Sequence, residues 1–398
     1  MSDQSTSFDL TGFNEFGVRA VLDGLGVIRG QVSRFDYDPA SRRLAVDLTG
    51  EGVAAEVGRF LDGMRNVHRF TARKVIGGHA GTVRLDHSID PELAASPDLH
   101  VMGPGLCSLR GGLLALFRYF EAEMRALADV FGAEDSHHPV MLPGALLAEM
   151  GYFGHFPHHV TCCCHFPDSL PVLEAVAAGA DRPWPELAAD YQARLTAPSH
   201  VLTPGVCLPC YPQQRGLRLA PGAVRTLTMQ NHVFRYEAGN FRPLARGWDF
   251  TVRDIVFFGA TADLEGLRRQ VMDRTLAMCA ALDLDVTLEL ANDPFFLDAS
   301  RDKAVYQRLG DVKYELLASL PGRDGGLAIS SFNLHRDYYT RLYDIGLEGG
   351  GGAESACMGF GLDRWLYAFV AQKGLDPQGW PRSVTTAIDA VTARQSRF

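Results

Sequence analysis

The sequence predicts an α+β fold in which an antiparallel sheet is flanked by helices. Three stretches support this prediction: a long amphipathic helix that ends near Gly132, a strand-rich region from Thr203 to Gly259, and a closing helix that ends at Gly374. An insert of helix and strand lies between the second stretch and the third. Helices and antiparallel strands combined in this way are typical of α+β domains.

The first 80 residues are expected to form a small mixed α/β unit. The periodicity of the apolar residues indicates two helices and three strands: helices over Gly17–Leu25 and Val53–Met64, and strands over Gln31–Tyr37, Arg43–Leu48 and Val67–Lys74. The glycines of the VIGGHAG stretch mark a boundary near residues 77–81. We therefore expect a small unit at residues 1–80 and a larger unit at residues 81–398.

A long helix is expected near the start of the larger unit. From Leu109 onward, apolar residues recur at steps of three and four, which places them on one face of a helix: Leu113, Leu116, Phe117, Phe120, Met124, Leu127 and Phe131. The HHPVMLPG segment that follows contains Pro139 and Pro143, which forbid further helix but suit an extended edge strand.

Strands dominate the next region. In the VFRYE stretch, Phe234 and Tyr236 alternate with Arg235 and Glu237, as on the two faces of a strand. The MGFG stretch is expected to be a glycine-rich turn. The remaining elements are a helix after Gly259, strands over Val286–Leu290 and Leu327–Phe332, and a closing helix with Leu362, Trp365, Leu366 and Phe369 inward.

Composition narrows the class of protein. The chain has 398 residues, 46% hydrophobic and 21% charged, and a formal charge of −9. An acidic balance disfavours a protein whose affinity comes from gripping nucleic-acid phosphates. No apolar run reaches eighteen residues and the first residues lack a secretory pattern, so we expect a cytoplasmic protein without a membrane span. The eight cysteines are then expected as thiols, some of them metal-bound.

Arg235 and Glu237 form the first candidate site. On one strand face they would place a guanidinium and a carboxylate about 7 Å apart. A guanidinium can donate two parallel hydrogen bonds to a phosphate, and a carboxylate can accept a hydrogen bond from an amine such as adenine N6. The alternative is a solvated strand face with a weak ion pair.

The second candidate is the GFGLDR stretch at residues 359–364. Glycines before a helix let backbone N–H groups approach an anion, and Arg364 in the first turn could reach a terminal phosphate. The alternative is a simple tight turn.

Cysteines form the third candidate. Cys207 and Cys210 make a CLPC motif, whose spacing suits zinc chelation or disulfide chemistry. Redox use is poorly supported, because prolines flank the pair. In the TCCCHF stretch, adjacent residues would point to opposite faces of a strand, so we interpret its three cysteines at residues 162–164 as buried thiols rather than a metal site with His165.

These pieces together resemble the catalytic domain of a class II aminoacyl-tRNA synthetase. The long helix and proline strand resemble motif 1, the stretch FRYEAGNFRPLARGWDFTVRDIVFFG resembles motif 2, and GFGLDR resembles motif 3. More narrowly, the chain resembles the amino acid:[carrier protein] ligases, truncated homologues of the atypical zinc-dependent seryl-tRNA synthetases. The supporting stretches, within residues 105–375, are GYFGHFPHH, LTPGVCLPCYP, NDPFF, VKYELLASLP, SSFNLHRDYY and ESACMGFGLDR.

The resemblance implies a zinc ion, one per chain, held by Cys207, Asp254 and Cys357. Cys210 competes with Cys207 for the first position. Asp254 departs from the family pattern, which has Glu there, and its shorter side chain requires the strand to lie closer to the metal. Three protein ligands leave a fourth position open, which in this family takes the α-amino group of the substrate.

The resemblance also implies an ATP site with Mg²⁺. Arg235 and Glu237 match the motif 2 pair, Phe250 the ring that stacks on adenine, and Arg364 the motif 3 arginine. Arg246 could assist along the phosphates. Asn333 and His335 match a stretch near the active site, with roles that the sequence does not fix.

The implied reaction activates a small amino acid, glycine or alanine in this family, as an aminoacyl-adenylate. The aminoacyl group then passes to the phosphopantetheine thiol of a carrier protein. The sequence leaves two alternatives, a seryl-tRNA synthetase and a non-catalytic regulatory paralogue. Carrier-protein loading is favoured over tRNA charging because residues 1–80 lack long heptads and a dense basic cluster. The resemblance to motif 1 also implies a homodimer. The run of four glycines at residues 349–352 is expected to be either an active-site loop or a turn.

Overall fold

The computed structural model describes residues 4–13, 17, 18, 21, 22, 25, 32–48, 53–68, 74–236, 241–291, 311–322 and 326–395. At its centre lies an eight-stranded sheet in which every pairing is antiparallel except that of β7 with β12. Its strands, in spatial order, are β4 (Val75–His79), β14 (Val286–Leu290), β15 (Lys313–Ala318), β16 (Leu327–Arg336), β18 (Glu354–Gly361), β13 (Asp249–Gly259), β12 (Arg225–Phe234) and β7 (Glu134–Ser136).

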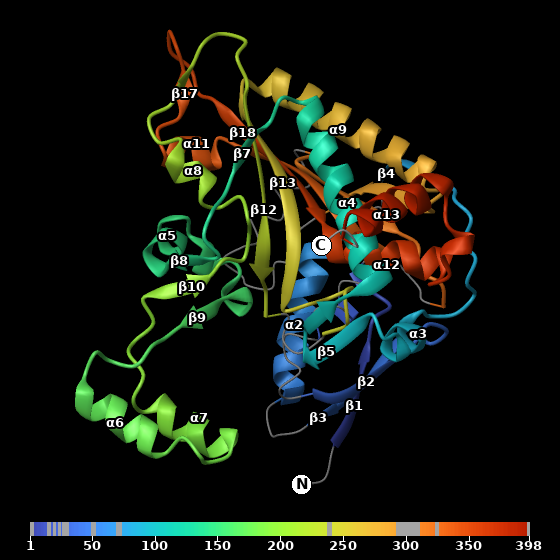
Figure 1. Ribbon diagram of the computed structural model, residues 1–398. Helices are drawn as coiled ribbons and strands as arrows, with labels where there is room; N and C mark the ends of the chain where they lie inside the picture. Colours follow the sequence, from blue (N-terminus) through green and yellow to red (C-terminus); the bar gives the residue numbers. More distant parts are fainter. Residues whose placement is uncertain are drawn as a thin grey trace.

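Helices cover one face of this sheet (Figure 1). They are α4 (Gly111–Val130), α9 (Thr261–Ala281) and α12 (Leu362–Lys373), with α13 (Arg382–Gln395) packed on α4. The alternation of β13 divides the apolar core in two, because Ile255 and Phe257 join the cluster under these helices while Val256 and Phe258 join the cluster on the other face. The predicted α+β fold, with an antiparallel sheet flanked by helices, is confirmed.

Smaller elements cover the opposite face (Figure 1). A three-stranded sheet places β10 (His200–Leu202) between β8 (Met141–Pro143) and β9 (Thr161–Cys163). The others here are α5 (Gly144–Glu149), the 3₁₀ turns η2 (Tyr152–Gly154) and η3 (Pro157–His159), α8 (Cys210–Gln213), α11 (Tyr338–Leu342), and the pair β11 (Arg218–Leu219) and β17 (Gly346–Leu347). From β9 and β10 the chain extends into a projecting pair of helices, α6 (Leu170–Ala178) and α7 (Trp184–Gln192). The expected edge strand is confirmed as β8, which ends at Pro143.

The remaining elements lie near the N-terminal part of the chain. Strands β1 (Gln4–Asp9), β2 (Val32–Asp38) and β3 (Arg43–Leu48) form a sheet with β3 in the middle, and α2 (Val53–His68) packs its apolar side into a separate core. Between this unit and α4 come α3 (Asp90–Ala95), β5 (Leu99–Gly103) and β6 (Leu106–Leu109), and η5 (Pro377–Gly379) precedes α13. The predicted strand pair and the helix from Val53 are confirmed.

Two N-terminal predictions need correction or lie partly outside the described residues. Helix α2 continues to His68, so the strand expected from Val67 does not begin there, and residues 69–73 lie outside the described part. The helix expected over Gly17–Leu25 also lies partly outside it. The sequence missed β1, which pairs with β3.

The glycine-rich stretch near residues 77–81 is a strand of the large sheet rather than a linker. Gly77 and Gly78 lie in β4, which pairs with β14. A β-carbon on Gly78 would lie 2.6 Å from the carbonyl oxygen of Val286, so the glycine permits the close approach of the two strands. The division of the chain into units at residues 1–80 and 81–398 stays a prediction.

The MGFG stretch is likewise a strand. It forms the end of β18, and α12 begins directly after it at Leu362. Its glycines do not form the expected turn, because Gly359 and Gly361 pair in register with β13. The predicted helix is confirmed, with Gly374 at its end at a φ of 79°.

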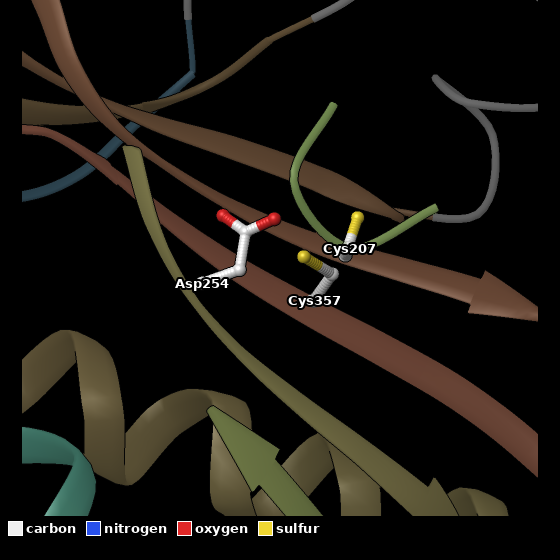
Figure 2. A group of neighbouring side chains, drawn as sticks. All are labelled: Cys207, Asp254 and Cys357. Atoms are coloured by element: carbon white, nitrogen blue, oxygen red, sulfur yellow. The ribbon is translucent and has the colours of Figure 1, made fainter. Parts of the chain in front are cut away.

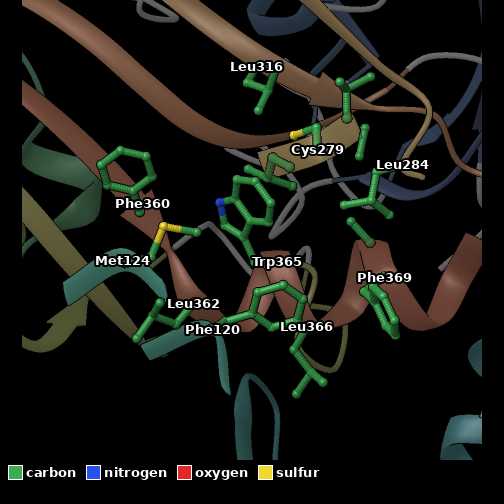
Figure 3. Close-up of a cluster of buried hydrophobic side chains, with 14 of the residues drawn as sticks. Phe120, Met124, Cys279, Leu284, Leu316, Phe360, Leu362, Trp365, Leu366 and Phe369 are labelled. Atoms are coloured by element: carbon green, nitrogen blue, oxygen red, sulfur yellow. The ribbon is translucent and has the colours of Figure 1, made fainter. Parts of the chain in front are cut away.

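The core under the helices centres on Trp365 (Figure 3). Its indole is fully buried, lies 5.8 Å from the ring of Phe120 and donates a hydrogen bond of 3.0 Å to Ser330 Oγ. These two contacts join α12 to α4 and to β16, so Trp365 stabilises the packing of three elements.

Trp365→Ala should lower the free energy of unfolding by about 3–5 kcal/mol, because it removes a large buried ring and leaves a cavity. Trp184→Ala is the matched control: this tryptophan is 69% exposed, and its loss should change stability by less than about 0.5 kcal/mol. Urea denaturation followed by circular dichroism measures both. Equal effects of the two substitutions would contradict this assignment of the core.

Candidate metal and nucleotide site

Three residues that are far apart in the sequence meet on the face of the sheet opposite the long helices. Cys207 lies in the loop between β10 and α8, Asp254 in β13 and Cys357 in β18 (Figure 2). Their potential ligand atoms all lie within 4.8 Å of one another. Among the residues that the structure describes, this is the one group of three or more His, Cys, Asp or Glu side chains arranged to hold a metal.

Strand pairing explains why Asp254 and Cys357 converge. In the register of β13 with β18, Cys357 pairs with Val256, and Asp254 lies two residues before Val256. Paired residues point to the same face of a sheet, as do residues two apart on one strand. Both side chains therefore point to the face over which the loop of Cys207 passes.

The donor set suits zinc. Two thiolates and one carboxylate on a tetrahedral zinc ion would stand about 3.5–3.8 Å apart, given Zn–S near 2.3 Å and Zn–O near 2.0 Å. From the observed limit of 4.8 Å, a contraction of about 1.3 Å at most would bring the ligand atoms to these separations. Asp254 and Cys357 are buried and Cys207 is half-buried, so one side of the group stays open.

The electrostatics of the group shift Asp254 and Cys357 toward their protonated forms. Burial raises the pKa of Asp254 to about 6, against the opposing effect of hydrogen bonds from the two thiols and of the Arg235 charge. The hydrogen bond with Cys207, together with burial, raises the pKa of Cys357 well above its ordinary value. A bound cation reverses this preference, so metal uptake and proton release are coupled.

Cys210 lies outside this group. It begins α8 and is buried in the apolar cluster with Tyr211. Burial raises the pKa of its thiol well above the ordinary value. Of the two cysteines that the sequence left open, the structure places Cys207 with Asp254 and Cys357.

The TCCCHF stretch corrects the prediction of buried thiols. Cys162 and Cys164 are exposed and Cys163 is half-buried, because β9 is the edge strand of the small three-stranded sheet. Among the described residues these cysteines join no metal-binding group.

Arg235 and Phe250 lie beside each other next to the metal group. The Arg235 guanidinium stands 5.8 Å from the centroid of the Phe250 ring, and its Nε donates a hydrogen bond of 2.8 Å to the Pro204 carbonyl. Strand β12 ends at Phe234, so the alternation expected through Arg235 is not that of a strand. Glu237 lies outside the described residues, so its distance from Arg235 stays a prediction.

The neighbouring Asp363 and Arg364 connect the first turn of α12 to two strands. Asp363 Oδ2 accepts a hydrogen bond of 2.6 Å from the backbone N–H of Thr251, which follows Phe250. Arg364 donates a hydrogen bond of 3.1 Å to the carbonyl of Ala328 in β16. Arg246 closes a short loop through backbone hydrogen bonds with Arg242.

Asn333 and His335, whose roles the sequence left open, form hydrogen bonds on the face of the sheet that carries the metal group. Asn333 Nδ2 donates to Ser331 Oγ at 3.2 Å and to the carbonyl oxygen of Cys357 at 3.4 Å. His335 Nδ1 is 3.1 Å from the hydroxyl of Tyr211, whose ring stacks on Tyr339 at 3.9 Å. The stretch SSFNLHRDYY therefore supplies support for the metal group.

Sequence reasoning missed a polar row that crosses five strands at the level of Asp254. In register, Glu289 pairs with Glu315, Glu315 with Ser331, Ser331 with Gly359, and Gly359 with Asp254. Lys313 forms an ion pair of 3.1 Å with Glu315. Alternating polar residues within the buried strand VKYELLA were the available signal.

The glycines at residues 349–352 form a hairpin turn, one of the two possibilities that the sequence left open. Leu347 N–H donates to the Gly351 carbonyl at 3.1 Å, and three of these glycines have positive φ. They line a cavity of about 600 Å³ with Arg218 and Asp344, and none of the three metal-group residues lines it.

Comparison with known proteins supports the resemblance. No family model matches the chain. It is 29% identical over 253 residues to amino acid--[acyl-carrier-protein] ligase 1 of Bradyrhizobium diazoefficiens. The matched region covers 64% of this chain and 76% of that protein. Ligase 2 of the same organism is also 29% identical, over 246 residues, 62% of this chain and 72% of that protein. A type-2 serine--tRNA ligase of Methanothermobacter thermautotrophicus is 28% identical over 197 residues, 49% of this chain and 38% of that protein.

Solved structures agree on the fold. The M. kandleri SerRS, crystallised with A. aeolicus tRNASec, superposes with a TM-score of 0.69 at 19% identity, over 90% of this chain and 74% of that one. The class II synthetase fold is thus confirmed, as is the resemblance to the carrier-protein ligases and the atypical seryl-tRNA synthetases.

Within the described residues, no helix combines the length and apolar character needed to cross a bilayer.

Cys207→Ser should abolish most metal binding, because it removes one of the three converging ligands. Cys210→Ser is the matched control on the same motif and should retain the metal. Elemental analysis of the purified proteins measures zinc, expected at about one per chain in the wild type. Full occupancy in Cys207→Ser, with loss in Cys210→Ser, would reverse the assignment.

Proposed function

We propose that this protein activates a small amino acid with ATP and transfers it to the phosphopantetheine thiol of a carrier protein. The observation that carries the proposal is the convergence of Cys207, Asp254 and Cys357 beside Arg235 and Phe250. Similarity to two amino acid--[acyl-carrier-protein] ligases supports a ligase of this kind.

The metal group fits the binding of an amino acid. Cys207, Asp254 and Cys357 would hold a zinc ion, which would supply a Lewis acid for an unprotonated α-amino group. The charge of Arg235 opposes the rise in the pKa of Asp254, and the same guanidinium would attract the carboxylate of a substrate whose amine lies at the metal group. Arg235 thus orients the nucleophilic carboxylate toward the nucleotide.

The same side chains fit ATP, taken as its Mg²⁺ complex. Phe250 provides a ring for the adenine, and Arg364, in the first turn of α12, a charge for the phosphates. We assign Arg246 to the phosphates and Glu237 to the adenine amine on the motif 2 resemblance alone. Hydrogen bonding of Asp363 to Thr251 holds the first turn of α12 and the adenine-binding end of β13 in one geometry.

The chemistry needs no protein nucleophile. In the first step a carboxylate oxygen of the amino acid bonds to the α-phosphorus and pyrophosphate leaves. Arg235 and Arg364 stabilise the negative charge that develops on the phosphate oxygens. In the second step the thiol sulfur bonds to the acyl carbon, AMP leaves with the bonding electron pair, and the thiol proton passes to solvent.

A carrier protein is the acceptor that we favour over tRNA. The chain has a formal charge of −9, and the sequence of residues 1–80 has neither long heptads nor a dense basic cluster. Similarity to type-2 serine--tRNA ligases keeps tRNA as the second candidate. None of the eight cysteines forms a disulfide in the structure, which supports the proposal of a reducing, cytoplasmic location.

Amino-acid-dependent exchange of pyrophosphate into ATP tests the first step. Wild-type protein should exchange label with glycine or alanine, and Arg364→Ala should lose at least about 100-fold of the rate, because a charge that stabilises the transition state is removed. Arg382→Ala, at an exposed position in α13, is the matched control and should exchange normally. Exchange by Arg364→Ala at the wild-type rate would contradict the role of Arg364, and no exchange by the wild type would favour a regulatory paralogue.

The acceptor is identified in the same assay mixture. Phosphopantetheinylated carrier protein should accumulate a hydroxylamine-sensitive aminoacyl thioester, whereas the apo-carrier, which lacks the thiol, should not. Charging of tRNA in place of the carrier would make the second candidate correct.

We also propose a homodimer, on the motif 1 resemblance of α4 and the short strands that follow it. Light scattering coupled to gel filtration should give about twice the monomer mass of 43.5 kDa. A monomeric mass at micromolar concentration would contradict this proposal.

A further inference from the structure

Gly359 occupies the position directly across the strand pair from the carboxylate of the metal group. It pairs with Asp254 on one side and with Ser331 on the other, so it lies between the two polar side chains. A β-carbon on Gly359 would stand 2.9 Å from Asp254 Oδ1 and 3.2 Å from Ser331 Oγ. The first distance is shorter than a carbon–oxygen contact allows, so the carboxylate uses the space that the missing side chain leaves.

Backbone geometry does not require glycine at this position. Gly359 lies inside β18, where its neighbours Met358 and Phe360 are ordinary buried residues, and it is absent from the positions with positive φ. Glycine in a strand interior weakens a strand and often marks a close approach of another group. The close approach here is that of the Asp254 carboxylate.

The rigid partner in this contact is the strand. Strand β18 is paired on both sides, with β13 and with β16, and Asn333 donates to the carbonyl of Cys357 next to it. The Asp254 carboxylate is the end of a side chain with two rotatable bonds. An added β-carbon would therefore displace the carboxylate rather than the strand.

We infer that Gly359 is a positioning residue of the metal centre, whose missing side chain lets the Asp254 carboxylate turn toward Cys207 and Cys357. The inference rests on the proposed function in so far as the centre binds zinc. An aspartate holds its carboxylate one methylene nearer the sheet than a glutamate does. The position of the Asp254 carboxylate is consequently sensitive to the size of the residue at position 359, across the strand pair.

The test compares Gly359→Ala with Gly361→Ala. Gly361 lies on the same strand and face, but a β-carbon there would have its nearest neighbours at 3.8 Å, an ordinary contact. Gly359→Ala should weaken zinc binding, measured by chelator competition, on the order of 10- to 100-fold, while Gly361→Ala should match the wild type. The absorption spectrum of bound Co²⁺ should also change in Gly359→Ala, since one oxygen ligand moves. Zinc affinity within twofold of the wild type and an unchanged spectrum would overturn the inference.

A double-mutant cycle on the metal-free protein separates this inference from the proposed function. Gly359→Ala should lower the melting temperature of the metal-free wild type, but it should have little effect in an Asp254→Ala background, where the space is empty. An equal decrease in both backgrounds would show general damage to the strand and overturn the inference. Failure of the wild type to bind zinc would contradict the proposed function while leaving this cycle to decide the role of Gly359.

Discussion

Antiparallel pairing of β13 with β18 is the constraint on which the candidate site depends. The two strands come from segments about a hundred residues apart, and their register alone decides that Asp254 and Cys357 share one face of the sheet. A shift of one residue would turn either side chain into the apolar core under the long helices. Helices α4, α9 and α12 hold that register from the other face, because Trp365 and its neighbours pack only when β18 leads directly into α12.

The two faces of the sheet differ in polarity. The face under the helices buries an apolar cluster that stabilises the fold. The other face buries a second apolar cluster but also carries the polar row from Glu289 to Asp254 and the thiol of Cys357. Polar groups buried in this way cost free energy unless they are paired or bind a ligand, which is typical of a functional surface.

Local periodicity predicted much of the fold. The long helix, the helix after Gly259 and the closing helix were found from apolar spacing, because one buried stripe determines each of them. The errors lie at glycines and strand ends. The glycines at residues 77 and 78 and the stretch at residues 358–361 lie in strands, since the absence of a side chain can serve close strand packing as well as a turn. Pairing partners far away in the sequence decide between the two, and local sequence does not contain them.

The metal group was predicted by resemblance rather than by local pattern. Cys207 and Cys210 are equivalent in the motif, and only the three-dimensional path of the loop places one of them over the sheet. The alternation of Lys313 and Glu315 was a signal for polar positions within one strand. The row across five strands and the position of Gly359 depend on cross-strand register, which local sequence does not contain. The exposure of Cys162 and Cys164 was also missed, since a short edge strand in a small sheet has no signal that differs from a core strand.

A crystal structure of the zinc-loaded protein with an aminoacyl-adenylate analogue, with diffraction recorded at the zinc absorption edge, would locate the metal and its ligands together. We expect an anomalous peak bonded to Cys207, Asp254 and Cys357 at about 2.0–2.3 Å, with the amino group of the analogue as the fourth ligand. A peak at other residues, or an amino group bound away from the metal, would contradict this expectation.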